Sequence, residues 1–494
     1  MLLQNKHQVN TQKRNIESWA PCPDCKGAGK KSQRLRKKVK QQYLKDLALF
    51  EKNNEQGKAP IRPKPHQAPC TACSGSGLLS AAKPPKPNFE NYPHVAIIGA
   101  GIGGAALAVA CLHRGIPFTL YERDNSFNER SQGYGLTLQQ ASKAIEGFGI
   151  KALKEGVVST QHKVHATDGT VVGQWGMRKW LSGDTSSASK RTNIHIARQA
   201  LRQELLEKLG DYNSVHWGHQ LVHFNDDKDQ GVSLKFSVNG EIKEAKATLL
   251  VGADGIRSAV RKNLFGAKHS PLRYLNCMVI LGICPLTAID TTERSLLDGA
   301  TVFQTANGND RIYMMPYTAN AIMWQLSFPI PEKEAMALHT SGSTALKHKA
   351  KQRTQWHAPI PQIIAATNTD QISGYPVYDR KILTSESFFT AGGVTLIGDA
   401  AHPMSPFKGQ GANQALLDAL ALARAISKGC RPAIPWKKTG IRKSVLTDFE
   451  LEMLSRSARK VKDSAAAAQF LHSDVALHKS DAPRGRFMKE DEKE

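Results

Sequence analysis

The sequence predicts an α/β fold in which a parallel sheet carries an inserted antiparallel sheet. A small cysteine-containing module precedes this part, and a C-terminal helix follows it. The prediction rests on a glycine-rich strand–helix–strand pattern over residues 94–123, two further apolar strands that end in glycine–aspartate turns, and two Cys-x-x-Cys pairs near the N-terminus. Short β-branched runs of this kind are typical of parallel strands that are buried on both faces.

The first pattern begins with a β-branched run at residues 95–98 and continues into Gly99, Gly101 and Gly104, spaced G-x-G-x-x-G. In a Rossmann-like domain the first glycine permits a tight turn, the second lets a pyrophosphate approach the backbone, and the third lets the helix pack closely. The helix N-terminus adds unpaired N–H groups and a positive dipole end. Glu122, at the end of the next strand, can accept hydrogen bonds from a ribose. The pattern therefore predicts a dinucleotide site.

Length and composition bound the class of protein. A chain of 494 residues with 40% hydrophobic residues exceeds one ordinary core, so two or three structural units are expected. No apolar run approaches the roughly 18 residues needed to span a bilayer, and no signal-peptide pattern opens the chain. We therefore expect a cytoplasmic protein with no transmembrane segment.

Positive charge is concentrated near the N-terminus. Residues 1–90 contain 18 Lys and Arg against 6 Asp and Glu, and the remaining 404 residues contain 49 against 37. Half of the net charge of +24 therefore lies in less than a fifth of the chain. One interpretation is a solvated, partly flexible basic arm. The other is contact with an acidic protein, a nucleic acid or a membrane surface.

Four of the eight cysteines form two pairs, CPDCKGAG at residues 22–29 and CTACSGSG at residues 70–77. Four thiolates satisfy tetrahedral zinc, and two residues between ligands let one tight turn offer both sulfurs. The C-x-x-C-x-G-x-G repeats resemble the zinc modules of DnaJ-type co-chaperones, and two repeats imply one structural zinc. A redox role is the alternative, but no βαβ pattern surrounds either pair. The expected zinc ligands are Cys22, Cys25, Cys70 and Cys73.

Composition and patterning divide the chain into segments. An apolar stripe predicts a helix over residues 32–53, and Thr447 with Glu450 has the spacing of a capping box that would open the C-terminal helix. The expected segments are a flexible basic tail (1–19), a zinc module with a basic helix (20–80), a proline-rich linker (81–93), a cofactor-binding domain (94–270 and 385–430), a substrate-binding sheet (271–384), and a C-terminal helix with a mobile tail (431–494).

Two later strands end in turns that carry an acid. Residues 248–251 run into Gly252, Asp254 and Gly255, and residues 394–397 run into Gly398 and Asp399. The second turn is followed by a glycine-containing loop and a long helix rich in alanine and leucine. Acids at the carboxyl ends of parallel strands lie where α/β folds bind ligands.

In this order, the three motifs resemble the class A flavoprotein monooxygenases, the aromatic hydroxylase family that includes para-hydroxybenzoate hydroxylase, urate hydroxylase and the tetracycline-inactivating enzymes. The resemblance spans residues 93–475. It implies FAD as cofactor, NAD(P)H as co-substrate, O2, and a small aromatic or polycyclic substrate.

The resemblance also implies roles for individual residues. The glycine motif would bind the ADP part of FAD, Glu122 its ribose, and Asp399 its ribityl chain. Asp254 and Gly255 match a motif linked to FAD and NAD(P)H, and the loop before the long helix would lie against the flavin ring. The expected cofactor-binding residues are Gly99, Gly101, Gly104, Glu122, Arg123, Arg130, Arg198, Asp254, Gly255, Asp399, Pro403, Gly409, Gly411, Ala412 and Asn413.

The sequence identifies substrate-binding residues less specifically than cofactor-binding residues. Residues 300–328 alternate and turn at Asn307-Gly308, which predicts an antiparallel hairpin over the flavin. Pocket candidates in this hairpin are Tyr313, Met315, Trp324 and Gln325, and packing in the sheet core is the competing interpretation for each. No catalytic residue is assigned.

The sequence thus predicts an FAD-dependent, NAD(P)H-consuming monooxygenase with a zinc module. One rival is a flavin reductase or dehydrogenase of the geranylgeranyl-reductase type, and substrate-stimulated oxygen use would separate the two. Another rival is a zinc-module interaction protein with a regulatory flavin domain.

Overall fold

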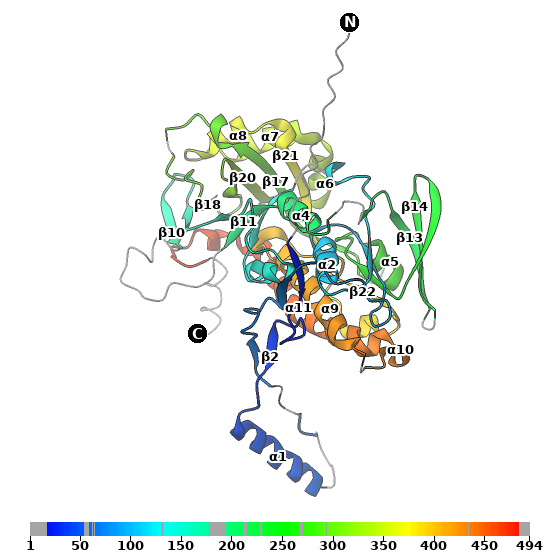
Figure 1. Ribbon diagram of the computed structural model, residues 1–494. Helices are drawn as coiled ribbons and strands as arrows, with labels where there is room; N and C mark the ends of the chain where they lie inside the picture. The colour runs from blue at the N-terminus through cyan, green and yellow to red at the C-terminus, as the bar shows by residue number, and fades with distance from the viewer. Residues whose placement is uncertain are drawn as a thin grey trace.

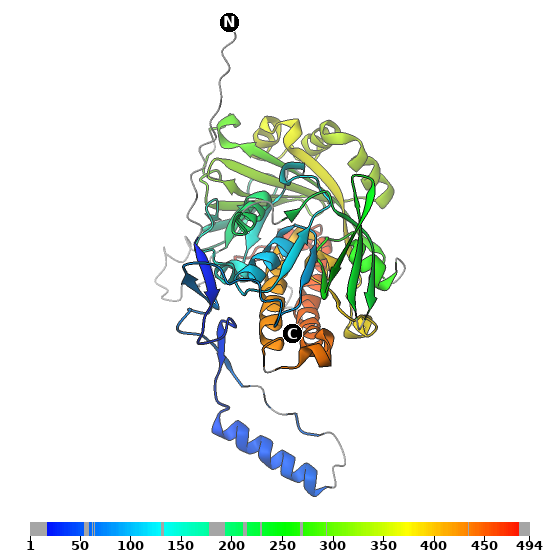
Figure 2. The ribbon, with the colours of Figure 1, turned by 45° about the vertical axis from the view of Figure 1, so that its right-hand side comes forward.

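The computed structural model describes residues 17–53, 59–61, 63, 65–129, 133–176, 193–210, 215–227, 230–266, 270–292, 294–432 and 434–483. Two sheets and the helices around them form the body of the molecule, and helix α1 projects from it (Figures 1 and 2). No helix in these ranges combines the length and the apolar composition needed to cross a membrane.

A parallel sheet lies at the centre of the lower part of the body. Every residue of β5 and β16 is buried, as expected for apolar strands covered on both faces. The chain adds strands on one side of β5 and then crosses to the other side, so a switch point lies between β5 and β16. In spatial order the strands are β12 (Val215–His216), β6 (Phe118–Tyr121), β5 (Val95–Ile98), β16 (Leu249–Gly252) and β22 (Val394–Leu396).

Helices cover this sheet, and two of them, α2 and α9, pack against each other. Small residues allow the approach, because a Cβ atom added to Gly103 would lie 3.4 Å from the Cβ of Ala415. The helices of this part are α2 (Ile102–Leu112), α4 (Arg198–Glu207), α5 (Ala259–Phe265), α9 (Gly411–Gly429), α10 (Trp436–Thr439) and α11 (Thr447–Phe470).

The second sheet has seven strands, and α6 (Glu332–Thr340), α7 (Gly342–Arg353) and α8 (Ile360–Ala366) pack on its outer face (Figure 1). All neighbouring strands are antiparallel except the pair β9–β18. The predicted hairpin is present, with Asn307 in its turn. In spatial order the strands are β10 (Val171–Trp175), β9 (Gln161–His165), β18 (Thr301–Ala306), β19 (Arg311–Thr318), β20 (Ala321–Pro329), β17 (Leu272–Pro285) and β21 (Ile372–Arg380).

The expected boundary of the substrate-binding sheet differs from the observed one. Strands β9 and β10 come from the range assigned to the cofactor-binding domain, yet they extend the seven-stranded sheet. Periodicity could not reveal this, because the parallel pairing of β9 with β18 joins segments far apart in the chain. Two three-stranded sheets complete the body: β7 (Gly135–Leu138), β11 (Ile194–Ala197) and β8 (Val157–Val158), and β13 (Gln220–Asp227), β14 (Gly231–Val238) and β15 (Glu241–Ala247).

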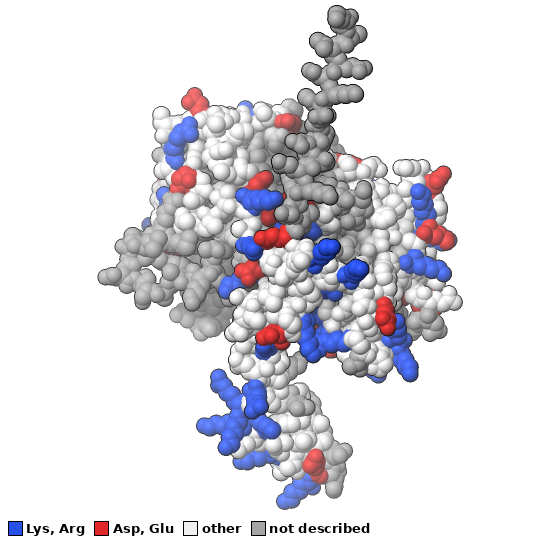
Figure 3. All heavy atoms as spheres, in the orientation of Figure 1, with Lys and Arg blue, Asp and Glu red and all other residues white. Residues whose placement is uncertain are grey.

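The N-terminal module consists of two strand pairs and α1 (Lys37–Lys52), which is shorter than the helix predicted over residues 32–53. No residue of α1 is buried, and Lys and Arg side chains gather at one end of the projecting segment (Figure 3). The strand pairs are β1 (Ser18–Pro21) with β4 (Leu78–Ala81), and β2 (Lys30–Ser32) with β3 (Gln67–Pro69).

The C-terminal helix forms, but the predicted capping box does not. A π-helical turn over Arg442–Leu446 leads directly into α11, so Thr447 is already helical and Glu450 instead binds Arg442 at 2.8 Å. The described part of the tail is also held in place. Asp481 accepts a hydrogen bond from the Gln174 amide at 2.8 Å, which packs the segment against β10.

Candidate functional site

The glycine loop between β5 and α2 has the geometry its spacing predicts. Gly99 has φ +101°, and a Cβ atom there would lie 2.7 Å from the Ala253 carbonyl oxygen. A Cβ on Gly104 would lie 1.9 Å from the Gly99 carbonyl oxygen, so only glycine lets this helix approach its strand. A Cβ on Gly101 would meet no atom within 4 Å, so the loop is open at this position.

Two helix N-termini that follow parallel strands, those of α2 after β5 and α9 after β22, lack a side-chain cap. Neither α2 nor α9 has a capping hydrogen bond from a side chain, and no acidic residue lies in the first turn of either helix. N–H groups and positive dipole ends therefore remain available for anionic parts of a ligand.

Glu122 is buried and supports the glycine loop. Its Oε2 accepts a hydrogen bond from the Ala100 amide at 2.7 Å, and its Oε1 accepts one from the Asp124 amide at 3.2 Å. Because a carboxylate offers about four acceptor positions, these bonds leave room for a ribose hydroxyl. Arg123 is largely exposed and lies 3.8 Å from Asp124. Arg130 lies outside the described residues.

Asp254 anchors the start of α5. Its Oδ2 accepts hydrogen bonds from the Ala259 amide at 2.7 Å and the Val260 amide at 3.2 Å, and burial raises the pKa of the carboxyl group. Arg261 on α5, which was not among the predicted site residues, donates to the Ala400 and Ala401 carbonyl oxygens at 2.9 Å each. The second motif therefore holds the third through an arginine.

Asp399 lies at the end of β22 and lines a cavity. Burial raises the pKa of its carboxyl group, and His402 and Arg198 oppose that effect. A separate acid, Asp418, holds the turn in place, because its Oδ2 accepts hydrogen bonds from the Gly398 amide at 2.8 Å and from His402 Nε2 at 2.7 Å.

The loop before α9, with Pro403 and Gly409, and the first two residues of α9, Gly411 and Ala412, contribute most of one wall of this cavity. Asn413 is different, because it is buried beneath the loop. Its Oδ1 accepts from the Gln139 and Ala141 amides at 2.9 and 3.1 Å, and its Nδ2 donates to the Thr137 and Gly409 carbonyl oxygens at 2.9 and 2.8 Å. Asn413 thus locks the loop onto β7 and does not line the cavity.

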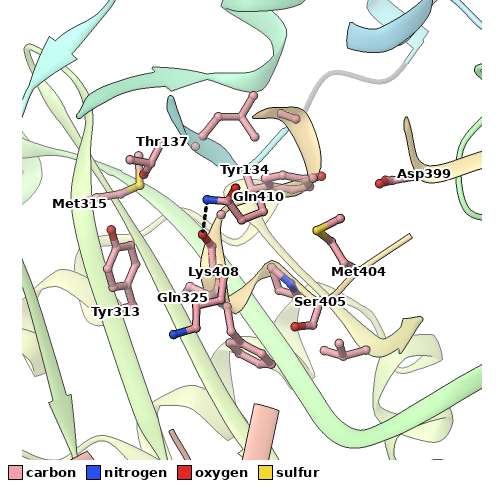
Figure 4. A pocket seen from close by; sticks show the side chains of 18 of the residues that line it. Tyr134, Thr137, Tyr313, Met315, Gln325, Asp399, Met404, Ser405, Lys408 and Gln410 are labelled. Carbon is pink, nitrogen blue, oxygen red and sulfur yellow. Dashed lines mark hydrogen bonds between the residues drawn. The ribbon is translucent and has the colours of Figure 1, made fainter. Parts of the chain in front are cut away.

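The cavity has a volume of about 680 Å³, which suits a small-molecule site. Asp399 lies on one side of it in Figure 4, Tyr313 and Met315 lie on the opposite side, and Gln410 and Tyr134 lie between them. One wall therefore consists of loops that follow the parallel strands, and the other is the inner face of the seven-stranded sheet.

Alternation along β19 and β20 decides which candidates face the cavity. Tyr313 pairs with Gln325 across the two strands, and both line the cavity together with Met315. Trp324 points to the opposite face, where it is fully buried and its Nε1 donates to Thr367 Oγ1 at 2.9 Å. Trp324 and Gln325 are adjacent in a strand, so they could not both face the cavity. The expectation for Trp324 is therefore not met.

Arg311 was missed by the sequence analysis, because an arginine at the start of a strand is usually solvated. It is 6% exposed and lines the cavity, and its Nε donates to Gln304 Oε1 at 2.8 Å. Burial lowers the pKa of Arg311 to about 10, and in the described part of the chain its guanidinium has no ion pair. Other cavity residues that the sequence analysis did not select include Tyr134, His162, Trp175, Tyr375 and Gln410.

Arg198 begins α4 beside the same cavity. Its amide donates to the Tyr134 carbonyl oxygen at 3.1 Å, and its guanidinium lies 6.0 Å from the centre of the Tyr134 ring. The arginine opposes the rise in the Asp399 pKa, so its positive charge acts on the cavity from the side of β7 and β11.

The four cysteines of the N-terminal module converge. Their sulfur atoms all lie within 4.8 Å of one another, all four residues are buried, and Cys25 Sγ lies 3.7 Å from Cys73 Sγ. The Gly29 amide donates to Cys25 Sγ and the Gly77 amide donates to Cys73 Sγ, each at 3.2 Å. Two equivalent turns therefore present four sulfurs to one point.

Comparison with known proteins gives one family match. A family described as FAD binding domain matches residues 92–433. The N-terminal cysteine module lies before this match.

Two curated relatives and one solved structure are similar to the chain. It is 31% identical over 336 residues to the aurachin C monooxygenase/isomerase of Stigmatella aurantiaca, covering 67% of this chain and 80% of the relative. It is 28% identical over 347 residues to the 3-amino-4-hydroxybenzoate 2-monooxygenase PtmB3 of Streptomyces platensis, covering 68% and 79%. Klebsiella pneumoniae HpxO, solved with FAD and uric acid, has a TM-score of 0.64 at 22% identity, covering 81% of this chain and 92% of HpxO.

Proposed function

The chain belongs to the class A FAD-dependent monooxygenases, and we propose that it uses NAD(P)H and O2 to hydroxylate a small aromatic or polycyclic substrate. The observation that carries the proposal is the cavity between the loop before α9 and the inner face of the seven-stranded sheet. The names of the relatives are consistent with it, since PtmB3 is named for an aminohydroxybenzoate and HpxO was solved with uric acid.

The described residues fit FAD. The open position at Gly101 and the uncapped N-terminus of α2 suit a pyrophosphate. Asp399 has no side-chain hydrogen bond within the described residues and faces the cavity, so its carboxylate suits a ribityl hydroxyl. The uncapped N-terminus of α9 at Gly411 borders the same cavity and suits a flavin ring that carries negative charge when reduced.

The chemistry that FAD supplies is the reductive activation of O2, with one oxygen atom going to the substrate and the other to water. The protein's part is to bind, orient and shield. Helix α9 contributes a fixed positive dipole end where negative charge develops, and the aromatic and apolar residues Tyr134, Tyr313 and Met315 exclude water from the cavity.

The inner face of the sheet supports a substrate with a hydrogen-bond acceptor or an anionic group. Arg311 carries a buried positive charge above the Tyr313 ring, and in the described residues its guanidinium donates a hydrogen bond only through Nε, to Gln304. A carboxylate, phenolate or carbonyl of the substrate would satisfy the remaining donors of this guanidinium. Gln325 and Tyr313 lie beside it and can accept or donate further hydrogen bonds.

The test is a screen of the purified yellow protein. Hydroxybenzoates, amino-hydroxybenzoates and aromatic polyketides are added one at a time while NADPH or NADH oxidation and O2 consumption are recorded. We expect at least one anionic aromatic compound to raise both rates together. Oxidation of NAD(P)H that no aromatic compound stimulates, or reduction of a substrate without O2 consumption, would contradict the proposal.

We also propose that the four cysteines hold one structural zinc ion. A tetrahedral site with Zn–S bonds of about 2.3 Å separates its sulfurs by roughly 3.8 Å, close to the 3.7 Å between Cys25 and Cys73. The two amide donors to sulfur are of the kind that support thiolate ligands. Metal analysis should give one zinc per chain, and Cys25→Ser should abolish it. Absence of zinc in protein purified without chelators would contradict the assignment.

Two smaller proposals complete the account. All eight cysteines are free, which supports a reducing compartment such as the cytoplasm. The lysine-rich α1 has no buried residue, which supports a contact with an acidic protein or another acidic surface. Salt-sensitive binding to a polyanionic resin that is lost on replacing Lys37, Lys38 and Lys40 by Gln would test this contact.

A further inference from the structure

Two arginines of the body contact the cysteine module. Arg114 lies two residues after the end of α2 and is 3% exposed, and Arg424 lies near the end of α9 and is half-buried. Both helices begin at the cofactor side of the molecule and end at the module.

Each arginine binds one of the two cysteine turns. Arg114 Nη2 lies 3.4 Å from the Gly27 carbonyl oxygen in the first turn. Arg424 Nη2 donates to the Ser76 carbonyl oxygen at 2.9 Å and lies 3.4 Å from that of Gly75 in the second turn. The fit is close, since a Cβ atom added to Gly29 would lie 2.6 Å from Arg424 Nη2.

Neither arginine has a compensating carboxylate. In the described part of the chain no ion pair involves Arg114 or Arg424, and the Nε atom of each is buried without a hydrogen-bond partner. A buried charge without a counter-charge is strongly destabilising. Both guanidinium groups lie against the turns that carry the cysteines, and the thiol of Cys25 acts electrostatically on each of them.

A zinc ion bound by four thiolates has a net charge of −2, which equals in size the charge of the two arginines. We infer that the zinc tetrathiolate is the counter-ion of Arg114 and Arg424, and that this pairing fastens the N-terminal module to the two helices that carry the cofactor loops. The inference rests on the proposed zinc site and adds to it a role for two residues of the monooxygenase domain.

The pairing has a consequence for stability. Arg424 lies 13 positions after Gly411 in α9, or about 20 Å along the helix axis. The zinc site is therefore far from the flavin, and the zinc takes no part in the oxygen chemistry. Its loss instead leaves the two cations at the ends of α2 and α9 without a counter-charge, so the whole cofactor-binding domain should lose stability along with the module.

The experiment compares zinc affinity in wild type, Arg114→Met, Arg424→Met and the double variant by competition of the intact FAD-bound protein with EDTA. Lys428→Met is the matched control, because Lys428 is an exposed cation one turn further along α9. We expect each single arginine variant to bind zinc about tenfold more weakly than wild type. This factor corresponds to a pKa shift of about one unit, the smallest shift that one nearby opposite charge usually causes. The control should match wild type.

Two further measurements separate charge from folding. Arg424→Lys keeps the positive charge but loses the planar guanidinium with its several N–H donors. It should therefore retain zinc better than Arg424→Met. Removing zinc should lower the unfolding temperature, which is followed by flavin fluorescence. The decrease should be smaller in the double variant than in wild type, because the double variant has no arginine cations that lose their counter-charge. Wild-type zinc affinity in the double variant, or equal loss of zinc in the Lys and Met variants, would overturn the inference. If wild-type protein purified without chelators contains no zinc, the zinc site itself is wrong.

Discussion

The two walls of the cavity are built on different principles. The wall formed by the loops after β16 and β22, against which the glycine loop after β5 packs, is held by backbone groups, close glycine contacts and buried acids such as Asp418. The wall formed by β19 and β20 presents side chains, and alternate residues face the cavity or the outer core. The first wall depends on residues that have no substitute, and the second depends on residues that could be exchanged.

This difference explains why one enzyme framework can serve different substrates. A loop whose geometry requires glycine at two positions constrains the sequence wherever the cofactor binds. The inner face of a sheet accepts any side chain of suitable size. We therefore propose that the sheet determines substrate specificity and that the loops bind the cofactor.

The largest effect should come from the glycine loop after β5, which packs against the loop wall at Ala253 and Asp254. Gly104→Ala places a Cβ atom 1.9 Å from a backbone oxygen, which cannot move aside without shifting β5 or α2. We expect FAD affinity to fall at least about a hundredfold, in line with the roughly 3 kcal/mol that overpacking can cost, and apo-protein stability to fall with it. Equilibrium dialysis of FAD and thermal unfolding of the apo-protein measure both quantities.

Gly101→Ala separates FAD binding from folding, because the new Cβ atom would meet no protein atom within 4 Å. Its apo-protein should unfold at the wild-type temperature while FAD affinity falls, since only a bound pyrophosphate occupies that space. If Gly101→Ala binds FAD normally, the loop is not the pyrophosphate site.

Asp399 tests whether an acid of this wall contacts the cofactor. Asp399→Ala removes an acceptor and should lower FAD affinity by about one to two powers of ten, on the order of 1–3 kcal/mol for an unpaired buried group. Asp399→Asn keeps an acceptor oxygen and should be milder. If both variants bind FAD as wild type does and only the apo-protein is destabilised, Asp399 acts as a structural residue.

The sheet wall should respond differently, and Arg311 gives its largest effect. Arg311→Gln removes the buried charge and should raise the KM for an anionic substrate about tenfold or more, the value of one charge-assisted hydrogen bond. FAD affinity should stay at the wild-type level. Arg311→Lys should recover part of the loss. A fall in FAD affinity equal to the rise in KM would break the assignment of separate roles to the two walls.

The smallest effect on catalysis is expected at Trp324. Trp324→Phe loses the bond to Thr367 on the outer face and should cost stability, about 1–3 kcal/mol, without changing KM. Its neighbour Gln325 faces the cavity, so Gln325→Leu should change KM and leave stability nearly unaltered. Steady-state kinetics and chemical denaturation of the pair show whether strand alternation divides function from packing.

Sequence reasoning succeeded where local chemistry is restrictive. The glycine motif, the three buried strands and the convergence of the four cysteines follow from spacing alone, because few other residues could occupy those positions. The family match over residues 92–433 agrees with that interpretation.

Sequence reasoning failed where the outcome depends on tertiary contacts. The hairpin at Asn307 was predicted, but the face that each strand turns to the cavity depends on which helices cover it, so Trp324 was misplaced and Arg311 was missed. Asn413 was expected against the flavin, but its four hydrogen bonds are all made inside the protein. The described part of the tail, which was expected to be mobile, packs on β10, a strand more than 300 residues away in the chain.

The most direct test of the central claim is the fate of oxygen in a single experiment. The FAD-bound protein is supplied with NADPH, ¹⁸O2 and an aromatic compound that stimulates NADPH oxidation, and the product is analysed by mass spectrometry. A monooxygenase predicts a hydroxylated product that carries one ¹⁸O atom, formed in step with the NADPH consumed. A product that is reduced and unlabelled, or one whose oxygen comes from water, would contradict the account.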